Sequence, residues 1–520
     1  MVSHSATTQQ EGVSLGTERW VLLSTILASS MAFIDGSALN VALPALQRDL
    51  GARGADLLWI VNAYLLFLSA LLLVGGSLGD IFGRKRVFMV GIAIFAGASL
   101  ACGLAPNTGV LIGMRAVQGI GGALMIPGSL AIITALVGAG RRGQAIGTWS
   151  AVTSIMIILG PWLGGELASR GLWRGVFFIN MPLALIALGI LWRSVPESHD
   201  EEALPEHLDY GGALLATLGL AGLTYGFIAA PERGFGDLGV LVGLVGGAGA
   251  LLGFAVVEAR GAHPMVPLRL FRSRTFSATN LLTLFLYAAL NGALFFLPLN
   301  LIQAQGYGDD VAGRAVVPFA LALALLSRWA GGLVDRYGPR PPLVVGPAVT
   351  GLGFLLLALP GLTDGPGQFW LTFFPGVAVA GVGMGITVAP LTTAVMSAVS
   401  SRQSGTASGI NNAVARVAGV LAIAILGGVA LWSFRSALLL RTADVNLPEG
   451  ARAALYQAAS DLGETTPPES VPPALRDAVQ GAIDLAFVDT FRLVVGIAAG
   501  LAWTSAVVAF VAVERRPGPA

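Results

Sequence analysis

The sequence has little charge and few of the residue types that carry out reactions in enzymes. Only 11% of its 520 residues are charged, against about 25% in soluble globular proteins. It has one cysteine, Cys102, and four histidines. One cysteine excludes an internal disulfide and a zinc site made of cysteines, and no His-Glu-x-x-His spacing occurs. We therefore expect no enzymatic activity, no metal and no cofactor, and the net charge of +1 gives no reason to expect a nucleic-acid partner.

Lysine is also nearly absent, since Lys85 is the only one. An ATP-driven pump needs a lysine directly after a glycine-rich loop, followed by Ser or Thr, to hold the nucleotide phosphates. Lys85 is instead followed by Arg86 within the basic stretch GRKR. If the chain moves a solute uphill, the energy must therefore come from an ion gradient or from a separate subunit.

In place of charge, the sequence has long apolar runs. Its residues are 55% hydrophobic and its mean hydropathy is +0.77. Runs of about 20 apolar residues can cross the ~30 Å hydrocarbon core of a bilayer as helices. The sequence therefore predicts an all-α polytopic membrane protein with fourteen transmembrane helices. We expect these spans at 20–43, 57–78, 87–105, 109–136, 144–168, 174–194, 210–230, 238–258, 276–303, 311–334, 342–361, 369–397, 406–433 and 489–513.

The positive charges indicate how the chain is oriented. Clusters of basic residues fall on the side of the two termini, at 84–86, 141–142, 260–274, 336–340 and 515–516. Basic residues collect on the cytoplasmic side of membrane proteins, so both termini are expected to be cytoplasmic. Arginine almost entirely replaces lysine and alanine and glycine are in excess, which favours a bacterial source. We therefore expect the chain in a bacterial cytoplasmic membrane.

Two distant parts of the chain are alike. QGIGGALMI from Gln118 matches AGVGMGITV from Ala380, GQAIG from Gly143 matches GTASG from Gly405, and both pairs are 262 residues apart. Same-direction repeats of six helices are the plan of one large class of transporters, and a shift of this length leaves room for two more helices. We therefore expect an N-terminal cytoplasmic tail (1–19), a six-helix bundle (20–194), a cytoplasmic linker (195–209), two additional helices (210–258), a second six-helix bundle (259–513) and a cytoplasmic tail (514–520).

The second bundle is expected to contain a long extracytoplasmic loop, 436–484, before its last span. Two stretches in this part of the chain, 448–464 and 472–487, have the pattern of amphipathic helices. The loop is either a solvated insertion or a lid over the outer vestibule, and the sequence leaves both open.

The charged residues Asp35 and Arg115 lie within the expected spans 20–43 and 109–136. An ionisable residue in hydrocarbon is expensive and marks a functional site by default. Binding a proton would neutralise Asp35 and remove its attraction for a nearby Arg115, so the two could convert proton binding into motion. Purely structural roles compete with this one: Asp35 could cap a helix break at Gly36, and Arg115 could extend to the cytoplasmic interface.

The stretch GPWLGG predicts a kinked and closely packed helix. Pro161 removes a hydrogen bond within the helix, and Gly160, Gly164 and Gly165 form a face of small residues that lets another helix approach. We expect these residues to form a seal on the outward side, the antiporter seal.

The stretch GGSLGDIFGRKR contains Asp80, Gly83 and Arg84 between two spans. Asp80 and Arg84 can pair with each other and with facing helix ends, and GGLVDRYGPR repeats the pattern with Asp335. We expect a gating latch that holds one conformation of the two bundles. The alternative is that the basic residues only anchor the orientation of the loop.

Several polar and aromatic residues in the expected spans could line a central cavity for a substrate. For each of them, ordinary helix packing is the competing role. The candidates are Trp59, Tyr64, Gln118, Asn291, Phe295, Asn411, Asn412 and Arg416.

At these motifs the sequence resembles the major facilitator superfamily, and within it the fourteen-helix drug:proton antiporters. GGSLGDIFGRKR is similar to the family motif between helices 2 and 3, RAVQGIGGA to that of helix 4, GPWLGG to the antiporter motif of helix 5, and FIDGSALNVALPAL to that of helix 1. The resemblance implies export of hydrophobic or amphipathic small molecules in exchange for protons, by alternating access. It also implies the site roles: Asp35 and Arg115 in proton relay, Asp80 and Arg84 in the latch, and Gly160, Pro161, Gly164 and Gly165 in the seal.

The chain departs from part of that family pattern. Relatives that export dications carry additional acidic residues in helices 2 and 13, where this chain has Asn62 and Arg416. The departure disfavours dicationic substrates and leaves neutral, monocationic and anionic ones. Export of an endogenous metabolite or lipid, or a facilitator without proton coupling, stays open as an alternative. We expect the chain to function as a monomer.

Overall fold

The structure is a computed structural model that describes residues 15–198, 209–261, 264, 266–399, 404–459 and 465–514. This described part of the chain is helical and contains no strand. Its helices, in chain order, are α1 (Leu15–Leu50), α2 (Gly54–Phe82), α3 (Arg84–Gly103), α4 (Thr108–Leu136), α5 (Ala139–Ser169), α6 (Gly175–Phe178), α7 (Asn180–Ser194), α8 (Tyr210–Arg233), α9 (Leu238–Arg260), α10 (Arg274–Gln303), α11 (Asp309–Arg314), α12 (Val317–Tyr337), α13 (Arg340–Leu357), α14 (Phe369–Thr372), α15 (Phe374–Ser397), α16 (Ser404–Thr442), α17 (Glu449–Ala458) and α18 (Arg476–Ala512).

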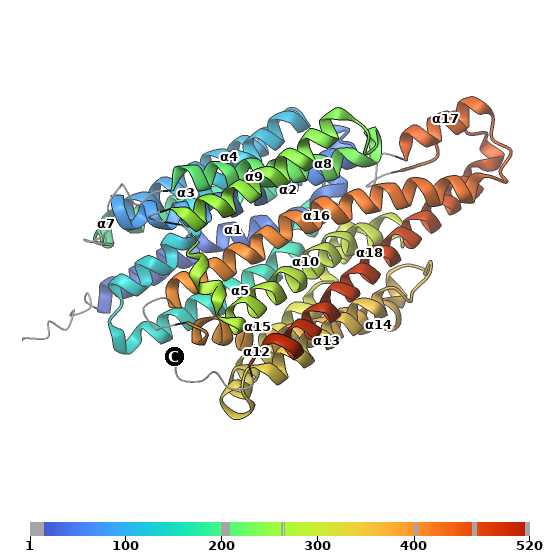
Figure 1. Ribbon diagram of the computed structural model, residues 1–520. Coiled ribbons are helices and arrows are strands. Elements are labelled where there is room, and N and C mark those ends of the chain that lie inside the picture. The colour runs from blue at the N-terminus through green and yellow to red at the C-terminus, as the bar shows by residue number, and fades with distance from the viewer. Residues whose placement is uncertain are drawn as a thin grey trace, which may run out of the picture.

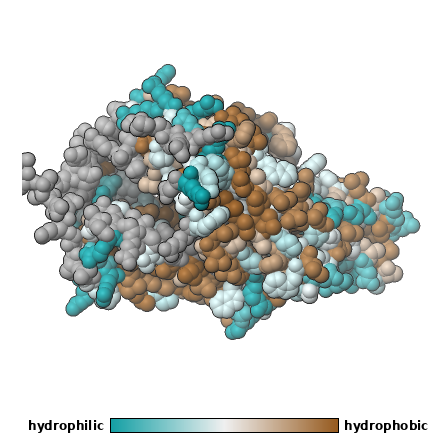
Figure 2. All heavy atoms as spheres, turned by 90° about the horizontal axis from the view of Figure 1, so that it is seen from below, coloured by the Kyte–Doolittle hydropathy of each residue, from teal (hydrophilic) through white to brown (hydrophobic). Residues whose placement is uncertain are grey.

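The length and composition of these helices are those of a membrane protein. Among the described residues, thirteen helical segments are long and apolar enough to cross a membrane. The one expected span that is not among these thirteen, 144–168, lies within α5. Apolar side chains cover the middle of the face shown in Figure 2, and hydrophilic side chains gather toward its tip. The chain is therefore a multi-pass, all-α membrane protein, as the apolar runs predict.

The pairing of the helices repeats along the chain. In the first half, α4 packs against α2 and α3, and α1 packs against α5 and α7. In the second half, α15 packs against α12 and α13, and α10 packs against α16 and α18. The similar stretches that begin at Gln118 and Ala380 lie on α4 and α15, which correspond in this pairing. Helices α8 and α9 form a hairpin outside both halves, with α8 along α2 and α16 (Figure 1).

The long helices run side by side between two ends of the bundle (Figure 1). At one end, Arg141 at the start of α5 donates a 2.8 Å hydrogen bond to Glu18 of α1. At the same end, Arg274 at the start of α10 donates a 2.8 Å hydrogen bond to the Val511 carbonyl near the end of α18. We call this the terminal end, because the first and last described residues lie there, and the opposite one the far end.

The far-end loop before the last span is shorter than the expected 436–484. Helix α16 continues to Thr442 and α18 begins at Arg476, so both helices extend beyond their expected apolar spans. An ion pair of 2.5 Å joins Arg441, in the extension of α16, to Asp489, the first residue of the expected last span. Polar contacts of this kind stabilise helix beyond the membrane, and a count of apolar residues does not detect them.

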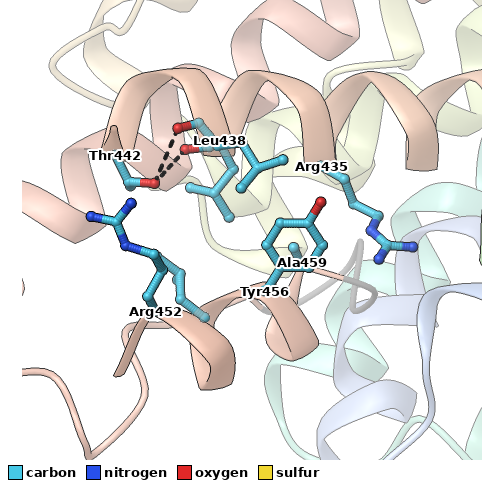
Figure 3. Close-up of a pocket in the computed structure, with 8 residues that line it drawn as sticks. Arg435, Leu438, Thr442, Arg452, Tyr456 and Ala459 are labelled. Atoms are coloured by element: carbon cyan, nitrogen blue, oxygen red, sulfur yellow. Dashed lines mark hydrogen bonds between the residues drawn. The ribbon is translucent and has the colours of Figure 1, made fainter. Parts of the chain in front are cut away.

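Helix α17 packs against the far end of α16 (Figure 3). Its Arg452 and Tyr456 face Leu438 and Thr442, and the guanidinium carbon of Arg435 lies 5.3 Å from the centre of the Tyr456 ring. The free space between these residues is ≈ 10 Å³, no more than one water molecule needs. The two helices are therefore closely packed here and leave no binding pocket between them. A lid function of this loop stays a prediction.

Candidate functional site

A buried ion pair joins α1 and α4 in the interior of the first half. The side chains of Asp35 and Arg115 are 0% and 1% exposed. Arg115 donates a hydrogen bond through its NH1 group to Oδ2 of Asp35. Gln118, one turn further along α4, donates to Oδ1 of Asp35 at 2.8 Å, and its own Oε1 accepts from Arg115 at 2.7 Å. The three side chains thus form a closed network in which both carboxylate oxygens of Asp35 have donors.

The surroundings of the pair hold the Arg115 side chain in place. Its Nε donates to the backbone carbonyl of Ile60 on α2 at 3.1 Å, and its guanidinium lies 4.4 Å from the centre of the Tyr64 ring, within cation–π range. A Cβ atom at Gly119 would collide with the Tyr64 carbonyl, so glycine is what lets α4 approach α2 this closely. The site is therefore preorganised by α1, α2 and α4 together.

This arrangement can respond to a single proton. In a site shielded from water, electrostatic interactions are stronger than in solution, and removing the charge of one partner of a buried pair leaves the other uncompensated. A proton on Asp35 would therefore weaken the attraction that holds α1 to α4. The expected proximity of Asp35 and Arg115 is present in the structure, and a cap at Gly36 or an Arg115 side chain at the membrane interface is not.

The glycines of GPWLGG bring α5 into contact with α1. A Cβ atom at Gly160 would collide with the Ser37 hydroxyl, and one at Gly164 would collide with the backbone of Ala38. Only residues without a side chain fit at this distance. The small-residue face predicted for this helix is therefore used for close helix packing.

The next glycine of the motif packs against the second half. A Cβ atom at Gly165 would collide with the backbone of Asp309 on α11, and one at Gly313 would collide with the Pro161 carbonyl. Beside this contact, Arg48 of α1 donates a 3.0 Å hydrogen bond to Asp309. The two halves therefore meet tightly at the far end.

We expect Gly164→Ala to weaken the packing of α5 on α1. The added methyl group would push α5 away from Ala38, and overpacking of this kind costs about 1–3 kcal/mol. Because each 1.4 kcal/mol shifts an equilibrium about tenfold, transport should fall by about ten- to a hundredfold at an unchanged amount of protein in the membrane. The control is Gly36→Ala, since a Cβ atom at Gly36 has no neighbour within 4 Å. Equal transport by the two variants would contradict close packing as the reason for Gly164.

The latch residues lie at the terminal end, between α2 and α3. Arg84 pairs with Asp80 one turn earlier, through Nε and NH2 at 2.8 Å each. Gly83 connects the helices with a φ of 104°, which side chains disfavour. The described contacts of Asp80 are within its own half, and the side chain of Asp335 lies outside those that the structure describes. A latch between the two halves therefore stays a prediction.

Sequence reasoning missed Glu197, which binds the start of α3. Its carboxylate accepts hydrogen bonds from the backbone N–H groups of Lys85, at 2.8 Å, and Arg86, at 3.2 Å. It lies against Gly83, where any Cβ atom would come within 2.8 Å of the carboxyl carbon. A carboxylate at a helix N-terminus satisfies free N–H groups and the helix dipole. Glu197 thus fixes the start of the expected linker, 195–209, to the first half.

We expect Glu197→Ala to lower the free energy of unfolding by about 0.5–2 kcal/mol, the usual value of a helix cap. Glu197→Gln should lose less, because an amide oxygen still accepts one hydrogen bond. Thermal unfolding of the purified protein in detergent micelles measures both. If Glu197→Ala unfolds at the same temperature as the wild type, the cap contributes nothing.

The residues predicted to line a cavity do not all share one environment. Tyr64 and Gln118 belong to the surroundings of the ion pair. Phe295 is 1% exposed and packs edge-on against Phe296 in the core, with ring centroids 5.0 Å apart, so it is not a free cavity wall in this conformation. Trp59 is partly buried against the same core.

The polar candidates on α10 and α16 also differ in their surroundings. Asn411 donates to the Thr283 hydroxyl at 2.7 Å and to the Asn280 side chain at 3.2 Å, and so joins the two helices. Asn291 donates to the Tyr287 carbonyl of its own helix at 2.7 Å. These contacts are those of helix packing, which was the competing role.

Asn412 and Arg416 have fewer partners. Asn412 is exposed and donates only to the Ser408 carbonyl, at 3.1 Å, among the described residues. Arg416 follows one turn later and is half-buried. Asn62 of α2 is fully buried, and neither atom of its amide has a hydrogen-bond partner in the described chain.

Two repeated halves of membrane-spanning helices around buried charges define a transport protein rather than an enzyme. A family model agrees, since that of the Major Facilitator Superfamily matches residues 25–423. The chain belongs to the Major Facilitator Superfamily, as its motifs predict.

Relatives similar in sequence include export and resistance proteins. It is 31% identical over 498 residues to the tetracenomycin C resistance and export protein of Streptomyces glaucescens, covering 95% of this chain and 92% of that one. It is 32% identical over 418 residues to the multidrug resistance protein Stp of Mycobacterium tuberculosis, covering 80% and 76%. It is 35% identical over 425 residues to the cephamycin export protein CmcT of Amycolatopsis lactamdurans, covering 81% and 86%. These names agree with the resemblance to the drug-exporting branch.

Solved structures share the fold. A bacterial homologue of the human lysosomal transporter Spinster superposes with a TM-score of 0.64 at 20% identity, covering 98% of this chain and 100% of that one. A D-xylose–proton symporter superposes with a TM-score of 0.59 at 14% identity, covering 96% and 98%. At this level of identity, the likeness concerns the fold alone.

Proposed function

We propose that the chain exports hydrophobic or amphipathic small molecules and that protons moving inward drive the export. The observation that carries the proposal is the buried network of Asp35, Arg115 and Gln118, because a carboxylate held in the membrane by one cation can be loaded and unloaded with a proton. Export and resistance relatives support the direction of transport. The positive charges of the terminal end support cytoplasmic termini in a bacterial cytoplasmic membrane.

In this mechanism, the ion pair couples the proton to the movement of the halves. With Asp35 ionised, Arg115 holds α1 and α4 together. A proton on Asp35 releases Arg115, and the contact between the halves can then rearrange, so that the cavity opens to the other side. The far-end contact of Gly165 and Asp309 supports a conformation in which the far end, which we propose to be extracytoplasmic, is closed. A closed outer side is the state in which cargo binds from the cytoplasm.

The remaining roles follow the same division of the chain. We assign 20–194 and 259–513 to two rocking bundles within one monomer, and 210–258 to two additional helices. Gly160, Pro161, Gly164 and Gly165 would seal the outer side, and Asp80, Gly83, Arg84 and Asp335 would hold the cytoplasmic side when it closes. Each role is testable by substitution.

A second candidate is export of one particular compound rather than many. Several relatives support it, because they are named for single compounds, as in the cephamycin export protein and a probable actinorhodin transporter of Streptomyces coelicolor. The two candidates differ in substrate range and share the mechanism.

Reconstituted liposomes test the proposal. The purified chain is placed in liposomes with a panel of neutral, cationic and anionic dyes, and dye movement is followed with and without an imposed pH gradient. We expect at least one dye to move against its gradient only when protons flow the opposite way. Movement at equal rates with and without the pH gradient would contradict proton coupling and favour a facilitator.

A further inference from the structure

Arg416 lies where α2, α10 and α16 meet. Its neighbours around α16 face the first half, since Ala413 and Val420 pack against apolar residues of α2. Beside Arg416, Val417 packs against the cluster that contains Leu66 and Ala70 of α2, and a Cβ atom at Gly419 would lie 3.4 Å from the Asn291 amide of α10. The guanidinium therefore lies between the two halves of the molecule.

The exposed part of this region faces the interior and not the lipid. In a helix of 3.6 residues per turn, Asn412 and Arg416 lie on the opposite side of α16 from Ile425 and Trp432. Those two are exposed apolar residues, as lipid-facing positions are. The exposure of Asn412 and the partial exposure of Arg416 are therefore to the space between the halves.

The positive charge of Arg416 is not compensated by the described part of the chain. No ion pair or hydrogen bond from a described residue reaches it. Asp35 is held by Arg115 and Gln118, so it does not supply the counter-charge. A guanidinium within the membrane is costly unless it is paired.

We propose that Arg416 binds an anionic group of the cargo, which makes the substrate an apolar molecule that carries a carboxylate, sulfonate or phenolate. The guanidinium of an arginine binds such oxygens through two parallel hydrogen bonds. The anion would supply the counter-charge that the protein lacks at this point. The inference rests on the proposed export function and adds the charge of the substrate to it.

Two probes that differ by one anionic group test this inference. 8-Anilinonaphthalene-1-sulfonate and N-phenyl-1-naphthylamine share one aromatic body, and only the first carries a sulfonate. Binding of each to the protein in phosphatidylcholine nanodiscs is measured by fluorescence, with empty nanodiscs subtracted. The variants are Arg416→Gln, Arg416→Lys and, as a control on the same helix, Arg435→Gln, whose guanidinium binds the Pro231 carbonyl at the far end.

We expect Arg416→Gln to weaken binding of the sulfonate by about ten- to a hundredfold, the range for a hydrogen bond to a charged group. Binding of the neutral probe should change less than twofold. Arg416→Lys should keep much of the sulfonate affinity, and Arg435→Gln should keep all of it. A wild-type protein that does not bind the sulfonate saturably, or an Arg416→Gln change that affects both probes equally, would overturn the inference.

An anionic lipid headgroup could also bind Arg416, and a change of nanodisc composition distinguishes it from cargo. Adding phosphatidylglycerol to the nanodiscs should leave sulfonate binding unchanged. If the anionic lipid displaces the probe, Arg416 binds a lipid headgroup and the assignment to cargo is wrong. Export of the neutral probe under a pH gradient is measured in parallel. A chain that exports the neutral probe but fails the binding test keeps its proposed function and loses only this inference.

Discussion

Replacing Asp35 by asparagine is expected to reduce proton-driven export to the rate of protein-free liposomes. Asparagine has the shape of aspartate and can accept the Arg115 hydrogen bond, but it cannot exchange a proton at physiological pH. Helix packing around α1 and α4 should survive, so the protein should reach the membrane in normal amount. Downhill exchange of substrate without a pH gradient should persist. The measurement is dye movement in liposomes, with and without the gradient.

The matched control for this substitution is Glu166→Gln. Glu166 also pairs with an arginine, Arg170, but on the surface of α5, where its side chain is 39% exposed. The control should transport like the wild type. If Asp35→Asn still exports against a gradient and that export stops when the pH gradient is collapsed, another group carries the proton and the proposed coupling is wrong.

Replacing Arg115 by methionine is expected to cause the largest loss of stability. The change leaves the Asp35 carboxylate buried without its cation, and breaking a buried pair in this way costs about 3–5 kcal/mol. The double variant Asp35→Leu/Arg115→Met removes both charges and should recover most of that loss, because a buried ion pair and an apolar pair of similar size have similar stability. It should still fail to export against a gradient.

Unfolding in detergent micelles measures these differences, with Arg170→Met as the control. The Glu166–Arg170 pair is exposed, so its loss should cost less than about 1 kcal/mol. A double variant that is no more stable than Arg115→Met would show that Arg115 acts through packing on Tyr64 and not through its charge.

The sequence predicted the membrane class, the repeat and the charged pair because each depends on local or strongly constrained signals. Apolar runs long enough to cross a membrane are rarely used for any other structure, and a carboxylate such as Asp35 inside such a run needs a partner. The Glu197 cap and the Arg48–Asp309 bond could not be predicted in this way. Their partners lie far apart in the chain, and only the packing of the helices brings them together.

The extended ends of α16 and α18 show the same limit. Arg441 lies beyond the apolar span that ends at 433, where hydropathy predicts a loop, and it pairs with Asp489 at the start of the last span. Phe295 was a candidate for the cavity wall, with helix packing as the competing role, and in this structure it lies in the core. Side-chain chemistry alone does not tell which face of a helix is turned toward its neighbours.

The α8–α9 hairpin covers one flank of the molecule, the flank formed by α2 and α16. Helix α8 runs along both α2 and α16, and the fit is close, because a Cβ atom at Gly428 of α16 would collide with the Phe227 carbonyl of α8. On this flank, a compound dissolved in the bilayer would have to displace the hairpin before it could pass between the two halves. If cargo enters from the membrane, we expect it to enter on the flank where α5 packs against α12.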